Sequence, residues 1–182
     1  MIVLGVRRLL LVTALVVTGL VAPAAGADEA TPCAFEVELT LSPGLSREPS
    51  SGTFRSEGES GTLDCQGDVG GRPATGRGTY GADGRYGTDG DGDHCRSKEG
   101  RGEGTASFTV PVEDGSRHID DPFTMTYRVE GRSVVGEITG RRFTGSFDVT
   151  RADGDCLRKA VTKIRIKGRG HLRDDPDAAL LP

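Results

Sequence analysis

Apolar residues recur at every second position in several short stretches of this 182-residue chain, and no stretch carries a convincing apolar stripe at helical spacing. In a β-strand, successive side chains point to opposite faces, so this alternation predicts strands with one buried and one solvated face. The stretches are Phe35, Val37, Leu39 and Leu41; Phe108, Val110 and Val112; Phe123, Met125, Tyr127 and Val129; Phe143, Phe147 and Val149; and Ile164 and Ile166. One-sided strands are typical of antiparallel sheets, so the sequence predicts an all-β fold.

Turn-forming residues separate these stretches at short intervals, for example at Asp114-Gly115. One predicted hairpin turns at Ala82-Asp83-Gly84, and a second turns around Gly140. About eight strands joined in this way predict a single antiparallel β-barrel of about eight strands, with a two-sheet β-sandwich as the alternative.

Two glycines favour the barrel over the sandwich. Gly136 and Gly145 fall on the apolar faces of their predicted strands. Inward glycines relieve crowding and allow the sharp bends that a barrel needs. Residues 47–60 and 88–104 are rich in Gly, Ser and charge, and they predict poorly ordered loops with at most a short strand around Phe54.

The start of the chain predicts an export signal. Arg7 and Arg8 precede an apolar run at residues 9–21, and an Ala-Gly-Ala cleavage site follows it. The run is shorter than the roughly 17 to 25 residues that a membrane span needs. We therefore predict a signal peptide at 1–27, one all-β domain at 28–173 and a disordered tail at 174–182, in a secreted, extracellular protein without a membrane anchor after cleavage.

Four cysteines follow the predicted signal: Cys33, Cys65, Cys95 and Cys156. An even number in an exported chain predicts two disulfides. Of the three possible pairings we favour Cys65 with Cys95 and Cys33 with Cys156, because Cys33 precedes the first predicted strand and Cys156 precedes the last. The cysteines form no close pairs of the kind that zinc sites use, so we predict no metal there.

Residues 89–94, Asp-Gly-Asp-Gly-Asp-His, could wrap a calcium ion. However, His94 and Gly100 stand where a helix-flanked calcium loop needs glycine and glutamate, so we interpret the segment as a solvated acidic loop, with a weak calcium site as the alternative. His94, His118 and His171 are widely separated, and no serine lies in a Gly-x-Ser-x-Gly motif. The sequence predicts no catalytic residue, no metal ligand and no cofactor.

The last strand-like stretch carries cations on one face: Lys163, Arg165, Lys167 and Arg169. This face is a candidate binding site for an anionic polymer of the cell envelope or for an acidic partner. The alternative is the outer face of a strand that its charges keep soluble. Because the chain has a net charge of −4 and no tryptophan, we do not expect it to bind nucleic acid.

The chain resembles small secreted all-β proteins of unknown function from high-GC Gram-positive bacteria. The resemblance lies in the signal, in Gly-Thr-Leu-Asp-Cys at 61–65, in the glycine-rich stretch through Cys95 and in Gly-Asp-Cys at 154–156. It implies location and fold, not activity. Architecture alone gives a looser likeness to the barrel of allene oxide cyclase-type proteins, and no catalytic position carries over.

A cross-linked scaffold without a catalytic motif favours a non-enzymatic binding or interaction module. Such a module would hold a small apolar ligand in the barrel mouth or present the basic strand to a partner. The alternative is a barrel enzyme of the isomerase or cyclase type, acting on an apolar substrate inside a cavity.

Overall fold

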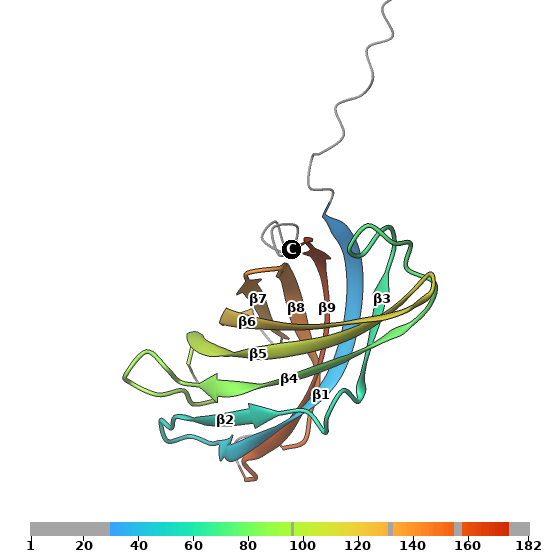
Figure 1. Ribbon diagram of the computed structural model, residues 1–182. Helices are drawn as coiled ribbons and strands as arrows, with labels where there is room; N and C mark the ends of the chain where they lie inside the picture. Colours follow the sequence, from blue (N-terminus) through green and yellow to red (C-terminus); the bar gives the residue numbers. More distant parts are fainter. Residues whose placement is uncertain (1–29, 96, 131–132, 155–157, 175–182) are drawn as a thin grey trace, which may run out of the picture.

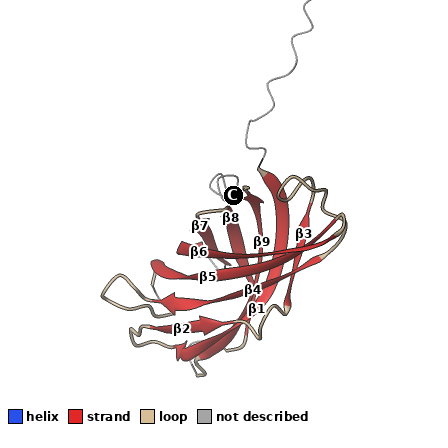
Figure 2. Cartoon of the chain, in the orientation of Figure 1, coloured by secondary structure: helices blue, strands red, loops and turns tan. Residues whose placement is uncertain are grey.

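The computed structural model describes residues 30–174 except 96, 131–132 and 155–157. All regular secondary structure in these residues is strand, which confirms the all-β prediction (Figure 2). The predicted signal peptide and all but the first residue of the predicted tail lie outside the described residues. The strands are β1 (Thr31–Leu45), β2 (Gly52–Arg55), β3 (Gly61–Cys65), β4 (Gly78–Tyr86), β5 (Glu99–Val112), β6 (Gly115–Glu130), β7 (Ser133–Gly140), β8 (Phe143–Ala152) and β9 (Val161–Leu172).

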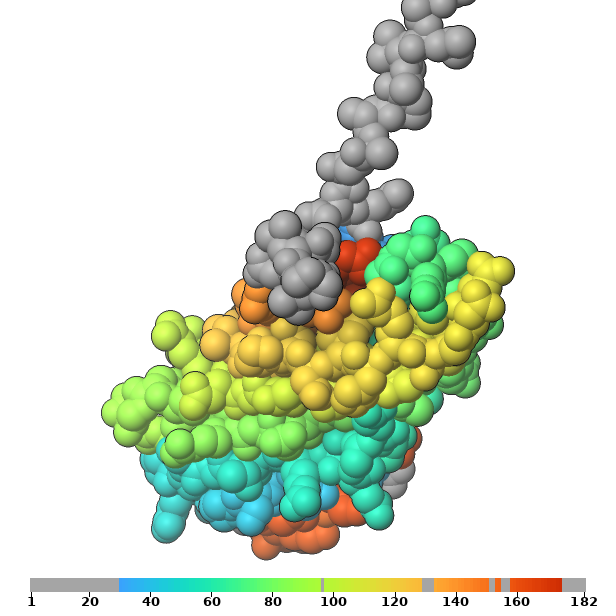
Figure 3. Space-filling model, viewed as in Figure 1, coloured from blue at the N-terminus to red at the C-terminus, as the bar shows by residue number. Residues whose placement is uncertain are grey.

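The strands form one antiparallel sheet that closes into a ring (Figure 1). Closure comes from β9, which pairs with β1 from Thr31↔Leu172 to Leu45↔Val161. On the other side of β1, the strands β2 and β3 lie one after the other, and both also pair with β4. The described residues therefore form one sheet of nine strands, one more than the roughly eight predicted, instead of the two sheets of the sandwich alternative. On the side of the molecule seen in Figure 3, successive strands lie next to one another as bands of successive colours.

The predicted alternation places the apolar residues inside this ring. In β1, Phe35, Val37, Leu39 and Leu41 are buried, and exposed or half-buried residues stand between them. Four aromatic rings fill the end of the ring that holds the start of β1, with neighbouring centroids 5.0 to 5.7 Å apart. They belong to Phe35, Tyr80, Phe108 and Phe143.

Inward glycines make room for these rings. A Cβ atom at Gly168 would lie 2.3 Å from the Phe35 ring, and one at Gly170 would lie 2.4 Å from the Phe143 ring. The predicted role of Gly136 is confirmed, because its Cβ would lie 2.3 Å from the Phe147 ring. At Gly145 the close neighbour is backbone, the Arg169 carbonyl oxygen at 2.5 Å. At Gly168, Gly170 and Gly136, the space left by the missing side chain is therefore filled by an aromatic side chain from the adjacent strand.

The two predicted hairpins have different outcomes. The turn around Gly140 is confirmed, since β7 ends there and β8 begins at Phe143. The turn at Ala82-Asp83-Gly84 is wrong, because these residues lie inside the continuous strand β4. Gly84 is needed there for packing and not for a turn: its Cβ would lie 2.6 Å from the Phe54 ring.

Two predicted loops also contain strands. The short strand expected around Phe54 is confirmed as β2. Residues 99–104, predicted as part of a poorly ordered stretch, are instead the first part of β5. Their alternating glycines resemble a flexible loop in sequence, yet in the structure these glycines face the interior.

The structure gives one disulfide among the described residues, where the sequence predicted two. It joins Cys33 to Cys65, which lie directly opposite each other on β1 and β3. Both predicted pairings, Cys65–Cys95 and Cys33–Cys156, are therefore wrong, because the order of cysteines in the chain does not reveal that β3 pairs with the start of β1. Cys95 is not a free thiol, and Cys156 lies outside the described residues. The Cys33–Cys65 bond is consistent with an extracellular protein.

Where the chain is described, no helix has the length and apolar character needed to cross a membrane.

A buried carboxylate fixes the turn between β7 and β8. Asp121 of β6 is 1% exposed. It accepts backbone N–H hydrogen bonds from Arg141 at 3.0 Å, from Arg142 at 3.0 and 3.1 Å, and from Phe143 at 2.8 Å. Gly140 leaves the space, because its Cβ would lie 2.2 Å from Asp121 Oδ2.

We expect Asp121→Ala to lower the free energy of unfolding by about 3 kcal/mol, since it leaves two partly buried N–H groups and one buried N–H group without their acceptor. The matched control is Asp120→Ala, which removes the exposed neighbouring carboxylate and should cost less than about 1 kcal/mol. Urea unfolding followed by far-ultraviolet circular dichroism measures both. Equal losses in the two variants would contradict the assigned role.

Candidate functional site

An apolar cavity of about 380 Å³ lies inside the ring, where β1 and β4 end and β5 and β9 begin. Its floor includes Tyr80 of the aromatic cluster. Strands from all around the ring contribute apolar side chains, among them Leu39 and Leu41 of β1, Phe123 of β6, Ile138 of β7, and Ile164 and Ile166 of β9. The same alternation that makes the strands one-sided therefore also makes this cavity apolar.

Glycines on β5 shape one wall of the interior. Gly100, Gly102 and Gly104 face inward and carry no side chain. Side chains from adjacent strands lie against them: a Cβ at Gly102 would lie 2.4 Å from the Met125 methyl group, and one at Gly100 would lie 2.5 Å from the Tyr127 hydroxyl. The hydroxyl end of Tyr127 thus lies over Gly100 of β5 and reaches the loop between β4 and β5.

Asp93 in that loop meets the Tyr127 hydroxyl, which donates a hydrogen bond to Asp93 Oδ2. Asp93 is only 2% exposed. Its backbone is held by a pair of 2.9 Å hydrogen bonds with Ser50, one in each direction. Close by, the Tyr86 hydroxyl donates to the Pro43 carbonyl oxygen. The cavity therefore has one polar end, where Tyr86 and Tyr127 line it and the buried carboxyl group of Asp93 lies behind the Tyr127 hydroxyl.

Burial sets the electrostatics of this polar end. It raises the pKa of Asp93, although the hydrogen bond from Tyr127 opposes the shift. The pKa of Tyr127 is also raised, first by burial and then by its hydrogen bond to Asp93 and the charge of that group. Burial raises the pKa of Tyr86 as well. Both tyrosine hydroxyls therefore keep their protons at neutral pH.

Two further polar residues of the β4–β5 loop line the cavity, His94 and Ser97. They satisfy each other: the His94 backbone N–H donates to Ser97 Oγ at 3.0 Å, and His94 Nδ1 lies 2.7 Å from the same oxygen. The Cys95 N–H donates to the Ser46 carbonyl at 2.8 Å, which ties this loop to the segment after β1.

The structure corrects the interpretation of residues 89–94. Asp89 and Asp91 are exposed, as a solvated loop requires, but Asp93 is buried. The described residues contain no group of three or more His, Cys, Asp or Glu that could hold a metal ion. Sequence reasoning missed Asp93, Tyr86 and Tyr127 as a group, because only the fold brings them together.

The three histidines lie apart. Besides His94 in the cavity, His118 lies on the outer face of β6, 3.2 Å from Glu59 and 3.4 Å from Asp120. His171 is exposed near the end of β9. No common site forms from them.

The predicted basic face of β9 lies outside the ring, opposite acids of β1. Lys167 Nζ lies 3.1 Å from Glu36, and Arg165 lies 3.2 Å from Glu38. Lys163 lies 3.5 Å from Glu38. The fourth predicted residue, Arg169, is exposed and lies opposite Ala34 of β1 and Ser146 of β8.

These ion pairs reduce the charge that β9 offers to a partner. The hydrogen bond from Arg165 and the charge of Lys163 hold the pKa of Glu38 below its ordinary value, so this carboxylate stays ionised at neutral pH. Three of the four predicted cations therefore have an anion beside them.

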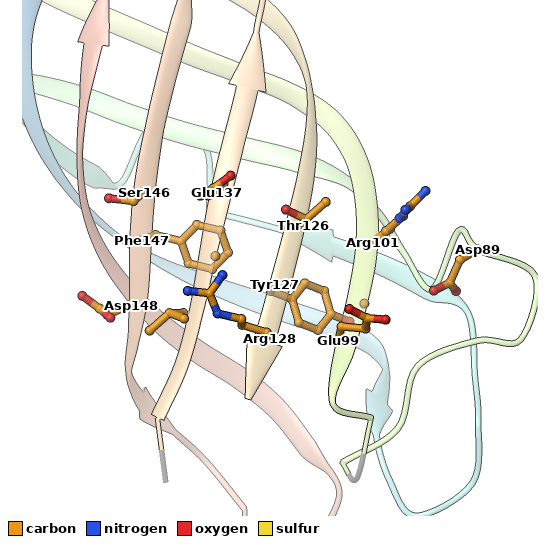
Figure 4. Close-up of a pocket in the computed structure, with 13 residues that line it drawn as sticks. Asp89, Glu99, Arg101, Thr126, Tyr127, Arg128, Glu137, Ser146, Phe147 and Asp148 are labelled. Atoms are coloured by element: carbon orange, nitrogen blue, oxygen red, sulfur yellow. The ribbon is translucent and has the colours of Figure 1, made fainter. Parts of the chain in front are cut away.

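A second hollow, of about 650 Å³, runs over β5, β6, β7 and β8 (Figure 4). Charged side chains of both signs surround it, including Glu99, Arg101, Arg128, Glu137 and Asp148. Its mixed charge and open position distinguish it from the apolar cavity inside the ring.

No protein-family model, no curated protein and no solved structure matches this chain.

The ion pairs of β9 predict how the protein behaves on an anionic column. We expect Glu36→Gln/Glu38→Gln to elute from heparin at higher salt than the wild type, because the variant exposes unpaired cations on β9. The control Glu48→Gln/Glu57→Gln makes the same change in net charge at exposed sites elsewhere and should shift elution less. If the wild type and Glu36→Gln/Glu38→Gln elute together, the acids do not mask the basic strand.

Asp93 predicts a pH dependence of stability. The ordinary pKa of 3.8 applies to the unfolded chain, and the folded pKa is higher, so the folded state binds more protons and loses stability as pH rises between the two values. Asp93→Asn removes this loss. We therefore expect the unfolding free energy of the variant, minus that of the wild type, to increase between about pH 4 and about pH 7.

Urea titrations at several pH values measure this difference. Asp89 and His94 act electrostatically on Asp93 and are present in both proteins, so their contributions cancel except for their interaction with Asp93 itself. The exposed control Asp91→Asn should give a difference that changes little with pH. A difference that falls with pH for Asp93→Asn would contradict the raised pKa.

Proposed function

We propose that this protein is an exported ligand-binding barrel that holds a small apolar molecule inside its ring. The observation that carries the proposal is the interior cavity of about 380 Å³, apolar on most of its surface and polar at one end. Sites for small molecules typically combine an apolar lining with a few placed polar groups. The predicted signal peptide and the Cys33–Cys65 disulfide support export.

The cavity volume limits the ligand. At a liquid-like volume of roughly 30 Å³ per non-hydrogen atom, the cavity takes about a dozen such atoms. This places the ligand among small apolar molecules and makes a long lipid chain a poor fit. Binding by the basic strand is the weaker proposal, because Glu36 and Glu38 already pair with its cations.

An isomerase or cyclase activity on the same kind of ligand is the second candidate. The observation that favours it is the contact between Asp93 and Tyr127, a buried carboxyl of raised pKa joined to a phenol. Such a pair can hold and move a proton next to a bound substrate. Turnover of a bound ligand would separate an enzyme from a carrier.

Intrinsic fluorescence tests the binding proposal directly. The chain has three tyrosines and no tryptophan, and Tyr80, Tyr86 and Tyr127 all line the cavity. A brominated alkane such as 1-bromononane quenches tyrosine emission on contact, so we expect saturable quenching when it is titrated into the wild type.

Two substitutions on β8 provide the matched comparison. Val149 lines the cavity and Thr150 is exposed. Val149→Phe should fill part of the cavity and weaken binding about tenfold, a loss of about 1.4 kcal/mol, whereas Thr150→Phe should bind as the wild type does. Quenching that does not saturate, or equal affinities in the two variants, would overturn the proposal.

A further inference from the structure

The two tyrosines at the polar end of the cavity have no donor left for a ligand. A phenol hydroxyl carries one hydrogen-bond donor and can also accept. Tyr127 donates to Asp93, and Tyr86 donates to the Pro43 carbonyl, a group that can only accept. What Tyr86 and Tyr127 offer toward the cavity is therefore acceptor capacity, and a ligand group that meets them must donate.

The charges of the residues around the cavity further limit the head group that a ligand can carry. The described residues that line the cavity include no Lys, Arg, Asp or Glu. Asp93 lies behind Tyr127, and its charge acts on both tyrosines. A ligand carboxylate would lose its hydration without a cation to replace it, and the charge of Asp93 would repel it. An ammonium group would also lose its hydration, and Asp93 would not replace it, because Asp93 lies behind Tyr127 and is not one of the lining residues. The head group is therefore neutral.

His94 adds a requirement of its own. Its Nδ1 is taken by Ser97 Oγ at 2.7 Å. The other ring nitrogen donates or accepts according to the tautomer. A ligand hydroxyl group can hydrogen-bond to this nitrogen in either tautomer, because it both donates and accepts, whereas an ether oxygen can only accept.

We infer that the ligand of this cavity is a small apolar alcohol, whose hydroxyl group donates to Tyr127 or Tyr86 and whose hydrocarbon body fills the apolar part. This inference rests on the proposed function and specifies its ligand class. It excludes fatty acids, amines and ethers as preferred ligands of the same site.

Three ligands of matched size test the inference: 1-nonanol, its isomer 1-methoxyoctane, and nonanoate. Their dissociation constants for the full mature protein are measured by calorimetry at pH 8. We expect 1-nonanol to bind about tenfold more tightly than the ether and at least tenfold more tightly than nonanoate. If none of the three binds, the proposed function fails. If the ether or nonanoate binds as tightly as 1-nonanol, the inference fails and the proposed function stands.

Substitutions of the tyrosines test which residues cause the preference for 1-nonanol over the ether. In Tyr86→Phe/Tyr127→Phe, the affinity for the ether should stay within about threefold of the wild-type value, and the tenfold preference for 1-nonanol should fall below about threefold. Tyr80→Phe, which changes the tyrosine of the aromatic cluster, should keep the full preference. A tenfold preference that survives in the double variant would overturn the inference.

A second variant keeps the test independent of the folding of the double variant. Asp93→Asn removes the acid behind the tyrosines and keeps its shape, so nonanoate should gain about tenfold in affinity while 1-nonanol changes less than threefold. An unchanged affinity for nonanoate would contradict the assigned role of Asp93 in excluding anions.

Discussion

The pairing of β1 with β9 is the interaction on which the interior depends. It joins the first long strand to the last over eleven residue pairs, so these two strands are not left as open edges. The inward residues of β1, such as Leu39, would otherwise face water. On the outside of the same seam, Glu36 and Glu38 meet Lys167 and Arg165. Exposed pairs of this kind contribute only about 0.2–1 kcal/mol each. The backbone pairing therefore closes the ring, and the ion pairs add only a small stabilisation to it. This contribution explains the charges of β9 without a binding partner.

Glycine determines how the closed interior is filled. Where Phe35 and Phe143 lie against Gly168 and Gly170, four rings pack together and leave no large space. Toward the other end, the β5 glycines receive Tyr127 and Met125 from β6. These side chains lie along the wall, and the centre stays open. The cavity is thus a consequence of where side chains lean, and not of a shortage of apolar residues at that end.

Local patterns explain which parts of this fold were predictable. The alternation at Phe35 to Leu41 and the turn at Gly140 depend on neighbours in the chain, and both predictions are confirmed. Gly84 lies against the Glu103 backbone and the Phe54 ring on neighbouring strands, and these contacts are not visible in the local sequence, so the pattern wrongly predicted a turn inside a strand. Disulfide pairing likewise depends on which strands become neighbours, and the predicted pairs are wrong. The antiparallel fold and an apolar interior site were predictable from the sequence, whereas the ring of nine strands and the volume and lining of the cavity were not, because free volume depends on side-chain directions.

The polar end of the cavity shows why Asp93, and not the basic strand, is the informative residue. A solvated acidic loop would keep every carboxylate in water, as Asp89 and Asp91 are kept. Asp93 is instead buried against Tyr127, and its backbone is fixed to Ser50. Burial of this carboxyl raises its pKa and so destabilises the folded protein at neutral pH. Proteins break their own packing rules chiefly at functional sites. Three of the β9 cations are ordinary surface charges, since each lies beside an acid. Asp93 is exceptional, because it is an acid buried in the interior.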